Sequence, residues 1–598
     1  MTYAAPVASS LLVRVVFGLL VVATLAAFFV TQRLKSADPI VSRVFYQPWI
    51  SPNGDGRKDV LRMRFRLPRS DRVTVSIVDE GGDEVRRLAD DRVLGARTHY
   101  FHWNGRTDDG RRAKEGEYRL RVGLRSQGRS LLAPRTVTVD TTPPKPRMVR
   151  VTPATMLPGD PGRRGRARVR YEGPSNPAPR FTVYRVAAEG RVREVDSFEG
   201  PRFRRTAEWD GLVGRPPRPA SDGAYAFAVT VLDEAGNRGS SPAELPPTRG
   251  DTAPRTGVTV RYLGLRGPLV PLAPREIARF RLGPKPRRLR FRLNRLGSSR
   301  PLVRGRGDGP RLAVRIPARA RAGLHLLRVQ AGGRRAIWPV AVEGRGRRRP
   351  TVVLPVIAWQ GLNPVDDDRD GFPDTLESSR AVRLGRPFAG GRLPPALLRE
   401  AAPLLRFLDR EELGYNLTTD LELAARPASL RGRGSLAFAG SERWLTERLD
   451  RQLRAFVERG GRIASFGVDS FRRRLTLEPG GLAEPSPPEP ANIFGERTSL
   501  VRTQRTAMVV SEDAALRLFA GTGGLVGSFS SFERSEARVP GARLLAAAGA
   551  DPRRPAFVAY RLGRGIVVRV GTPEWSRALS RQGEVATVTG RLWQLLSR

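Results

Sequence analysis

The chain has 598 residues, and its 105 Lys and Arg against 59 Asp and Glu give a formal net charge of +46. Its length predicts about four domains, and the absence of cysteine excludes disulfides, thiolate metal sites and a cysteine nucleophile. All but five of the basic residues are arginine, spread through every segment, which indicates a compositional bias rather than a nucleic-acid surface. Attraction to an anionic wall polymer or a lipid surface is the alternative.

The first apolar run sets the expected compartment. Leu11–Val30 is interrupted only by Arg14 and has about the length that spans a ~30 Å hydrocarbon layer. A cleaved signal peptide is the alternative, but its cleavage site needs small residues, and Lys35-Ser36-Ala37 places a lysine there. We therefore expect residues 1–37 to form an uncleaved signal anchor, with residues 11–30 in the membrane.

The orientation of this anchor rests on two opposing observations. Arg33 and Lys35 follow the apolar run, and a positive-inside count would keep that side cytoplasmic. The domains that follow have the pattern of exported modules, and we give that observation more weight. The sequence thus predicts a single-pass protein of the cell membrane whose C-terminal domains are extracellular.

Residues 38–142 predict an antiparallel β-sandwich. Val73, Val75 and Ile77 alternate with polar residues, and turn residues separate such runs. The stretch FHWNGRTDDGRRAKEGEYRLRV (Phe101 to Val122), with its W-N-G, D-G and G-E-Y groups, resembles the Ig-like domain of the flagellar hook-capping protein. The resemblance implies an Ig-like fold, in which we expect Trp103 and Tyr118 to be core residues without chemistry of their own.

A short loop near the start of this module, SPNGDGRKDV, holds a candidate site. Asn53, Asp55 and Asp59 offer oxygen ligands at i, i+2 and i+6, a spacing by which a tight loop can surround a hard cation. An Asx-turn would use the same residues with no ion. The sequence leaves both interpretations open and predicts here, at most, a weaker calcium site.

Two further Ig-like modules are predicted at residues 143–252 and 253–347. The first repeats the W-[ND]-G … G-x-Y scheme, with Trp209-Asp210-Gly211 and Tyr225. The second has alternating strands, beginning at Val258–Val260, but no signature. All histidines of the chain lie in the β-modules and are expected to be packing or surface residues rather than ligands: His99, His102 and His325.

The pattern changes at residues 348–598, where strands alternate with helices. Thr351–Ile357 is a continuous apolar run, typical of a strand that is buried on both faces of a parallel sheet. The alternation predicts a doubly wound, Rossmann-like α/β domain. Its further strands are expected at 435–440, 460–467 and 565–571, and its helices at 397–408, 445–459 and 585–596.

Several stretches of this region resemble the C-terminal domain of the N,N-dimethylformamidase beta-subunit-like family, which is related to the class I glutamine amidotransferase-like fold. They are IAWQGLNPVDDDRDGFPDTL, FLDREELGYNLTTDLEL, AFAGSERW, FVERGGRIASFG and GRGIVVRVGTPEWS, over roughly residues 350–598. The resemblance implies amide hydrolysis, yet amidotransferases use a cysteine activated by histidine, and this region contains neither. Where the family is expected to have a histidine and a tyrosine near GSERW, Ser441 and Arg443 stand instead.

Polar residues at the carboxyl ends of the predicted strands are weak catalytic candidates, because such folds bind ligands at that edge. Ser441 follows a strand and Gly440, but the region has no histidine or lysine to act as its base, so we expect a loop or N-cap residue. A hydrolase here would work without a cysteine or histidine nucleophile–base pair, through Tyr415, Asp420, Glu442 and Glu574.

The stretch VDDDRDGFPDTLE at Val365 to Glu377 is the strongest candidate site. It fits D-x-D-x-D-G-x5-E, the calcium loop of an EF-hand. Pro373 departs from that pattern and the preceding segment is not helical, so we expect a stand-alone, structural calcium loop, with a solvated acidic loop as the alternative. The predicted ligands are Asp366, Asp368, Asp370, Phe372 through its carbonyl, Asp374 and Glu377.

The sequence therefore favours a membrane-anchored surface protein with an Ig-like stalk and a calcium-braced, non-catalytic head that acts in binding or assembly at the cell envelope. Its expected partners are the membrane and a cell-wall polymer or surface protein, with nucleic acid not expected. A tethered hydrolase of amide, peptide or glycan bonds is the first alternative, and polyanion binding is the second.

Overall fold

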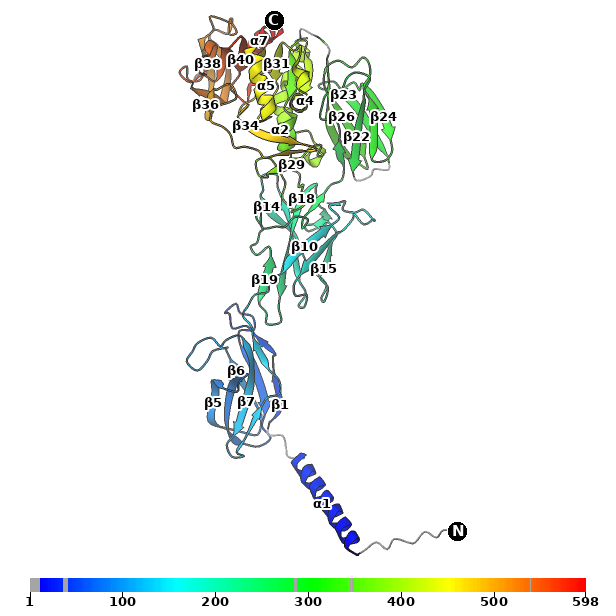
Figure 1. The fold of residues 1–598 in the computed structure, drawn as a ribbon, viewed down its shortest axis with the longest axis vertical. Helices are drawn as coiled ribbons and strands as arrows, with labels where there is room; N and C mark the ends of the chain where they lie inside the picture. The colour runs from blue at the N-terminus through cyan, green and yellow to red at the C-terminus, as the bar shows by residue number, and fades with distance from the viewer. Residues whose placement is uncertain (1–10, 36–40, 284–287, 345, 347–348, 538) are drawn as a thin grey trace, which may run out of the picture. The chain divides into compact units, whose positions relative to one another are not determined.

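The computed structural model describes residues 11–35, 41–283, 288–344, 346, 349–537 and 539–598. The expected domain boundaries after residues 37 and 347 and the cleavage motif at Ser36-Ala37 fall at least partly outside the described residues. The chain forms two compact units (Figure 1), which are described separately. One comprises Met1–Pro146, Gly173–Pro179 and Thr230–Ser240, and the other Arg147–Glu172, Arg180–Val229 and Ser241–Arg598.

The N-terminal apolar run is a single helix, α1 (Leu11–Lys35). Within it, Leu11–Thr31 has a mean hydropathy of 2.5, and none of its most apolar window is buried against protein. Large apolar side chains exposed along a whole helix are unfavourable in water. By length and composition this helix can cross a membrane.

The first module is a β-sandwich of two sheets. Trp103 and Tyr118 pack in its core with their ring centroids 5.2 Å apart, as the Ig-like signature predicts. One sheet has the order β1-β3-β6 and the other β2-β9-β7-β4-β5, with β8 on β7. The strands are β1 (Ser42–Tyr46), β2 (Trp49–Ile50), β3 (Leu61–Arg66), β4 (Asp71–Asp79), β5 (Glu84–Leu94), β6 (Thr98–Trp103), β7 (Gly116–Leu124), β8 (Arg129–Leu132) and β9 (Val137–Val139).

The second module repeats this plan, with Trp209 against Tyr225 at 5.3 Å. Its sheets are β10-β12-β15, β11-β20-β18-β13-β14 with β19 on β18, and the pair β16-β17. The strands are β10 (Arg147–Thr152), β11 (Thr155–Met156), β12 (Ala167–Glu172), β13 (Arg180–Val186), β14 (Val192–Glu199), β15 (Thr206–Trp209), β16 (Leu212–Val213), β17 (Arg218–Pro219), β18 (Gly223–Leu232), β19 (Arg238–Ser241) and β20 (Val258–Val260).

The strand β20 corrects one expectation. We expected it to open the third module, but it pairs with β18 and β11 of the second. A run of three alternating residues does not say which sheet it joins, because the pairing partner is distant in the sequence.

The third module has two sheets, β21-β22-β25 and β24-β23-β26-β27. A partly buried ion pair, Arg295 to Asp409 at 2.6 Å, joins β23 to the region that follows. The strands are β21 (Gly264–Arg266), β22 (Ile277–Gly283), β23 (Leu289–Arg295), β24 (Val303–Gly307), β25 (Arg311–Arg315), β26 (Gly323–Ala331) and β27 (Arg334–Val342).

The C-terminal region is built on a nine-stranded sheet in the order β30-β28-β31-β33-β40-β39-β38-β36-β37. The first five strands are parallel, and the last four run antiparallel to their neighbours. The strands are β28 (Thr351–Leu354), β30 (Asn416–Thr419), β31 (Ser435–Phe438), β33 (Arg462–Ser465), β36 (Arg497–Glu512), β37 (Leu525–Ala537), β38 (Arg543–Gly549), β39 (Phe557–Leu562) and β40 (Gly565–Arg569).

Helices and a small sheet surround this large sheet. Alternate strand residues such as Val352 and Val353 feed two different apolar clusters, one on each face. The small sheet is β29 (Ala381–Arg383), β35 (Gly481–Ala483), β34 (Arg473–Glu478) and β32 (Trp444–Thr446). The helices are α2 (Val356–Gly361), α3 (Ala402–Arg410), α4 (Asp420–Ala425), α5 (Glu447–Glu458), α6 (Trp575–Ala578) and α7 (Gly583–Ser597), with short turns Ala389–Gly391, Leu397–Ala401 and Pro427–Leu430.

This arrangement corrects the predicted fold class. The buried strands lie where their apolar runs indicate, but the sheet is mixed and the chain as a whole is mostly β. A doubly wound Rossmann-like domain is therefore not confirmed. Arg569 at the end of β40 bonds Glu496 at 2.5 Å and Glu533 at 3.4 Å, and this buried group joins the parallel strands to the antiparallel ones.

Candidate functional site: an acidic loop and a buried carboxyl pair

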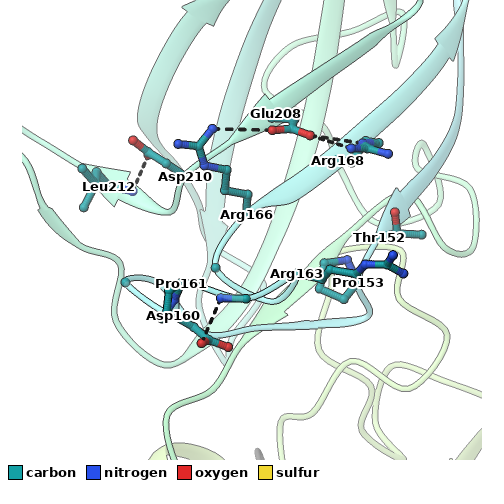
Figure 2. A pocket seen from close by; sticks show the side chains of 13 residues that line it. Thr152, Pro153, Asp160, Pro161, Arg163, Arg166, Arg168, Glu208, Asp210 and Leu212 are labelled. Carbon is teal, nitrogen blue, oxygen red and sulfur yellow. Dashed lines mark hydrogen bonds and ion pairs between the residues drawn. The ribbon is translucent and has the colours of Figure 1, made fainter.

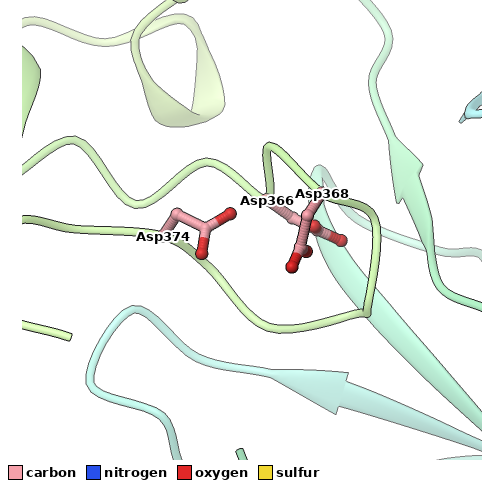
Figure 3. Close-up of side chains that lie close together, drawn as sticks. All are labelled: Asp366, Asp368 and Asp374. Atoms are coloured by element: carbon pink, nitrogen blue, oxygen red, sulfur yellow. The ribbon is translucent and has the colours of Figure 1, made fainter. Parts of the chain in front are cut away.

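The acidic loop lies between α2 and β29 and brings three carboxylates together. Figure 3 shows Asp366, Asp368 and Asp374. Each offers an oxygen, and these oxygens lie within 4.8 Å of one another. The loop is closed at its base by a backbone bridge between Val365 and Asp374, with the amide of Asp374 donating to the carbonyl of Val365 at 2.9 Å. Such a group can hold a metal ion.

The loop's own backbone holds these carboxylates in place. Asp366 accepts hydrogen bonds from the amides of Arg369 (2.6 Å) and Gly371 (3.0 Å). Asp374 accepts from the amide of Asp367 at 2.6 Å. Arg369 and Gly371 both have positive φ, 66° and 98°, which turns the chain tightly enough for these bonds to form.

Burial makes the ionised form of this loop unfavourable. It raises the pKa of Asp366 to about 8, and the neighbouring Asp370 adds to the shift. It also raises the pKa of Asp370 to about 7. Packed carboxyl groups of this kind hold protons near neutral pH unless a positive charge compensates them.

Two arginines supply part of that compensation. Arg249 lies 3.5 Å from Asp374, and the buried Arg386 lies 3.1 Å from Asp367. Arg386 also donates to the carbonyls of Val365 (3.2 Å) and Asp374 (3.0 Å), so it supports the loop from inside. Neither arginine is near the loop in sequence, so the spacing of the acidic stretch gives no signal for them.

The loop is docked against the second β-module. The amides of Arg255 and Gly257 donate to the carbonyls of Asp368 (3.0 Å) and Arg369 (2.6 Å). Phe372 is 1% exposed. It packs in an apolar cluster with four residues of that module's large sheet: Tyr184, Val186, Ala226 and Ala228.

Gly371 is the closest point of this docking. A Cβ at Gly371 would lie 2.6 Å from the Cα of Ala226, and one at Gly257 would lie 2.2 Å from the amide nitrogen of Gly371. No larger residue fits between the loop and the module. The glycine of the D-x-D-x-D-G pattern is thus needed for its turn and also for this contact.

The other predicted ligands lie elsewhere. Asp370 accepts from the amide of Phe372 at 2.6 Å and is not in the three-carboxylate group. Glu377 is half exposed and forms an ion pair with Arg443. In the N-terminal loop, the side chains of Asn53, Asp55 and Asp59 accept from backbone amides two to five residues away, as an Asx-turn network does.

Of the catalytic candidates, the structure brings Asp420 and Glu442 together. Asp420 begins α4 after β30 and accepts from the amides of Val356 (2.9 Å) and Ile357 (3.0 Å). Glu442 follows β31, is fully buried, and among the described residues no hydrogen bond of standard geometry reaches its carboxyl oxygens. Burial, and then the charge of Asp420, raise the pKa of Glu442, while burial raises that of Asp420.

The remaining candidates bond other partners. The Tyr415 hydroxyl donates to Asp409 at 2.9 Å and accepts from Arg295 at 3.3 Å, at the amino end of β30. Glu574 accepts from the amide and hydroxyl of Ser530, at 2.9 Å and 2.8 Å. The amide of Ser441 donates to Glu400 at 2.7 Å, and no base contacts its hydroxyl among the described residues.

The second module also carries a surface hollow of about 950 Å³ that sequence reasoning did not single out (Figure 2). Glu208 lies between Arg166 and Arg168, at 3.6 Å and 2.9 Å. Asp160 accepts from the amide of Gly162 at 3.2 Å. These charges are satisfied within the module.

Comparisons with known proteins agree with both resemblances. Residues 309–487 match the family model of the N,N-dimethylformamidase beta subunit-like C-terminal domain. This range begins in the third β-module and ends before the C-terminal half of the large sheet, so it differs from the expected 350–598. Residues 55–128 match the FlgD Ig-like domain.

Other comparisons carry no argument for function. No curated protein matches the chain. Solved structures include a catalytic mutant of Gan42B, a GH42 β-galactosidase from G. stearothermophilus (13% identity, 40% of this chain and 30% of that one, TM-score 0.23). The mmIFT52 N-terminal domain (14%, 34% and 91%, TM-score 0.23) and the human OSCAR ligand-binding domain (17%, 33% and 92%, TM-score 0.19) are similarly distant.

The close approach of Gly371 to the second module gives a stability prediction. Gly371→Ala keeps the hydrogen bonds of the loop but places a methyl group against Ala226. We expect it to cost about 2 kcal/mol more than Gly385→Ala, which also loses a glycine at positive φ but has open space around its Cβ. Calorimetric unfolding of the full chain measures both variants. Equal losses would show that the contact does not constrain the loop.

The buried carboxyl pair gives a pH prediction. A carboxyl group whose pKa is raised in the folded chain contributes its full stability at pH values below its pKa in the unfolded chain, which is near 4. This contribution is lost as the pH rises toward the pKa in the folded chain. Glu442→Gln removes one such group. The variant should therefore gain stability relative to the native chain between pH 5 and pH 8, by up to roughly 1.4 kcal/mol per pH unit.

The measurement is the unfolding midpoint of both chains at the two pH values. Glu458→Gln, at an exposed position, is the matched control and should show little change in its difference from the native chain. A constant difference for Glu442→Gln at both pH values would contradict the raised pKa.

The chain thus combines a FlgD Ig-like domain with a region that matches the N,N-dimethylformamidase beta subunit-like C-terminal family.

Proposed function

We propose that the chain is a membrane-anchored surface protein whose β-modules carry a calcium-braced head, and that it acts in binding or assembly at the cell envelope rather than in catalysis. The observation that supports this most is the docking of the acidic loop on the second module. A cation in this loop would stabilise a junction between modules, which is a structural role.

The ligand chemistry supports calcium. The three converging groups are carboxylates, and the described part of the loop offers only oxygen ligands. Calcium accepts six to eight oxygens in flexible geometry, whereas zinc and iron favour nitrogen and sulfur. In this proposal Asp366, Asp368 and Asp374 bind the ion directly, and Asp370, the Phe372 carbonyl and Glu377 join after local adjustment.

The placement of the catalytic candidates supports a non-catalytic role: of the four, Asp420 and Glu442 lie together, and both are buried. Tyr415 and Glu574 each bond their own partners, and Glu442 is fully buried. A hydrolase needs its acid, base and nucleophile around one accessible site. The tethered hydrolase is therefore the weaker proposal.

The apolar helix α1 supports the membrane anchor. Its exposed side chains and its length suit a hydrocarbon layer. We propose that the modules lie outside the cell, where calcium is abundant enough to fill a weak site. Residues 11–30 are the proposed membrane contact, and a cell-wall polymer or a surface protein is the proposed partner.

The calcium proposal predicts a specific response of the full chain in detergent micelles. Calcium should bind with measurable heat and raise the unfolding midpoint, because it binds the folded loop and not the unfolded chain. Asp368→Ala should abolish both effects, while Asp90→Ala, an exposed aspartate of the first module, should leave them unchanged. Titration calorimetry and thermal unfolding with and without chelator provide the readouts. No heat and no shift in the folded native chain would contradict the proposal.

A further inference from the structure

The third β-module carries a charge imbalance that the rest of the chain lacks. Residues 253–347 contain 24 Lys and Arg but only three Asp and Glu, a net charge of +21 out of the chain's +46. An even arginine bias would give this stretch about a sixth of the excess charge, in proportion to its length. The excess positive charge is therefore concentrated in this stretch, because it contains few acidic residues.

The arginines gather on one face of the sheet β24-β23-β26-β27. Residues directly opposite each other in an antiparallel sheet share a face. The register places two neighbouring rows side by side on this face. One row is Arg306, Arg290, Gln330 and Arg335, and the other is Arg304, Arg292, Arg328 and Ile337. We call these six arginines the arginine grid.

The grid is electrostatically unfavourable by itself. Arg290 faces Arg306, and Arg292 lies between Arg304 and Arg328, and like charges directly opposite each other destabilise a sheet. Among the described residues, no carboxylate forms an ion pair with any of the six. Some exposed arginines in the other modules have such partners, for example Arg72 with Asp91 at 2.8 Å and Arg168 with Glu208 at 2.9 Å.

The grid also has the shape of a binding face. It lines a shallow hollow of about 950 Å³, and five of the six side chains are exposed, with Arg328 half-buried. Asp308 is the one acidic residue at its rim, beside Arg306 in the adjoining hollow. An anionic ligand could reach several guanidinium groups at once.

The composition of the face favours an extended polymer. Among the eight residues of the two rows, Ile337 is the one large apolar side chain, and it is half-buried, so the rows offer no exposed apolar group that would insert into a lipid layer. The two rows contain no aromatic residue on which a nucleic-acid base could stack, and Phe291, which also borders the hollow, packs against the core from the other face of the sheet. These arginines start from backbone positions about 5 Å apart across the strands and about 7 Å apart along them, so their guanidinium groups can meet repeated anionic groups on a linear chain.

We propose that the arginine grid binds an extended, phosphate-bearing polymer. Each guanidinium fork can take two oxygens of one phosphate, and the two rows would engage successive phosphates. This proposal rests on the proposed binding role, for which it names a partner. It does not depend on the acidic loop, because the arginine grid lies outside that loop.

Inorganic polyphosphate is the probe, added to the full chain in neutral detergent with chelator present. We expect saturable binding whose affinity falls steeply with salt. The triple variant Arg290→Gln, Arg292→Gln and Arg304→Gln should weaken binding by about tenfold or more, since three phosphate contacts are lost. Its unfolding midpoint should be unchanged or raised, because repulsion within the grid is relieved.

The matched control removes the same charge from the module's other sheet, through Arg279→Gln, Arg281→Gln and Arg315→Gln on β22 and β25. It should retain binding. Equal weakening in both triple variants, or no binding by the native chain, would overturn the proposal. Equally tight binding of polyglutamate or of duplex DNA would overturn the choice of phosphate polymer.

The calcium response of the same protein preparations, measured without chelator or polyphosphate, separates this inference from the proposed function. Failure of polyphosphate binding with an intact calcium shift would refute the grid alone. Loss of the calcium shift with intact polyphosphate binding would refute the calcium-braced head alone.

Discussion

The burial of closely packed carboxylates in the loop at residues 365–377 is the main physical constraint at the junction between the second module and the C-terminal region. Three oxygens within 4.8 Å of one another, two of them on buried side chains, cannot all carry charge without compensation. Arg249 and Arg386 compensate in part, yet burial, together with the neighbouring carboxylates, still raises the pKa values of Asp366 and Asp370. A bound cation would remove this residual cost and hold the loop in the shape that docks.

The docking gives the acidic loop a structural role in this arginine-rich chain. Its backbone pairs with Arg255 and Gly257, and Phe372 fills an apolar cluster of the second module. The same loop reaches the C-terminal region through Arg386, which bonds Gln360 and Asp367. The protein thus has two charged features. The acidic loop places negative charge at the junction, where a cation could bind and strengthen it. The exposed sheet face of the third module carries positive charge without acidic partners in the described part of the chain.

The sequence alone predicted the local features and missed the long-range ones. Apolar runs located β28, β31, β33 and β40, because strands buried on both faces need no distant partner to be recognised. The D-x-D-x-D-G spacing located the acidic loop, but it could not reveal Arg249 or Gly257, which reach it through tertiary folding. The EF-hand consensus also predicts Glu377 as a ligand; the structure places it in an ion pair with Arg443, outside the three-carboxylate group, so this role stays a prediction. The sequence reasoning missed the arginine grid because a count of arginines along the chain does not show where acidic residues are few.

The most direct test of the junction is amide hydrogen exchange in the full chain, with calcium and with chelator. The amides of Arg255 and Gly257 donate to the loop carbonyls, so their exchange reports whether the loop is docked. The account predicts that calcium slows exchange at these two amides while leaving Leu67 in the first module unchanged. Equal rates at Arg255 and Gly257 in both conditions would contradict a cation-dependent junction.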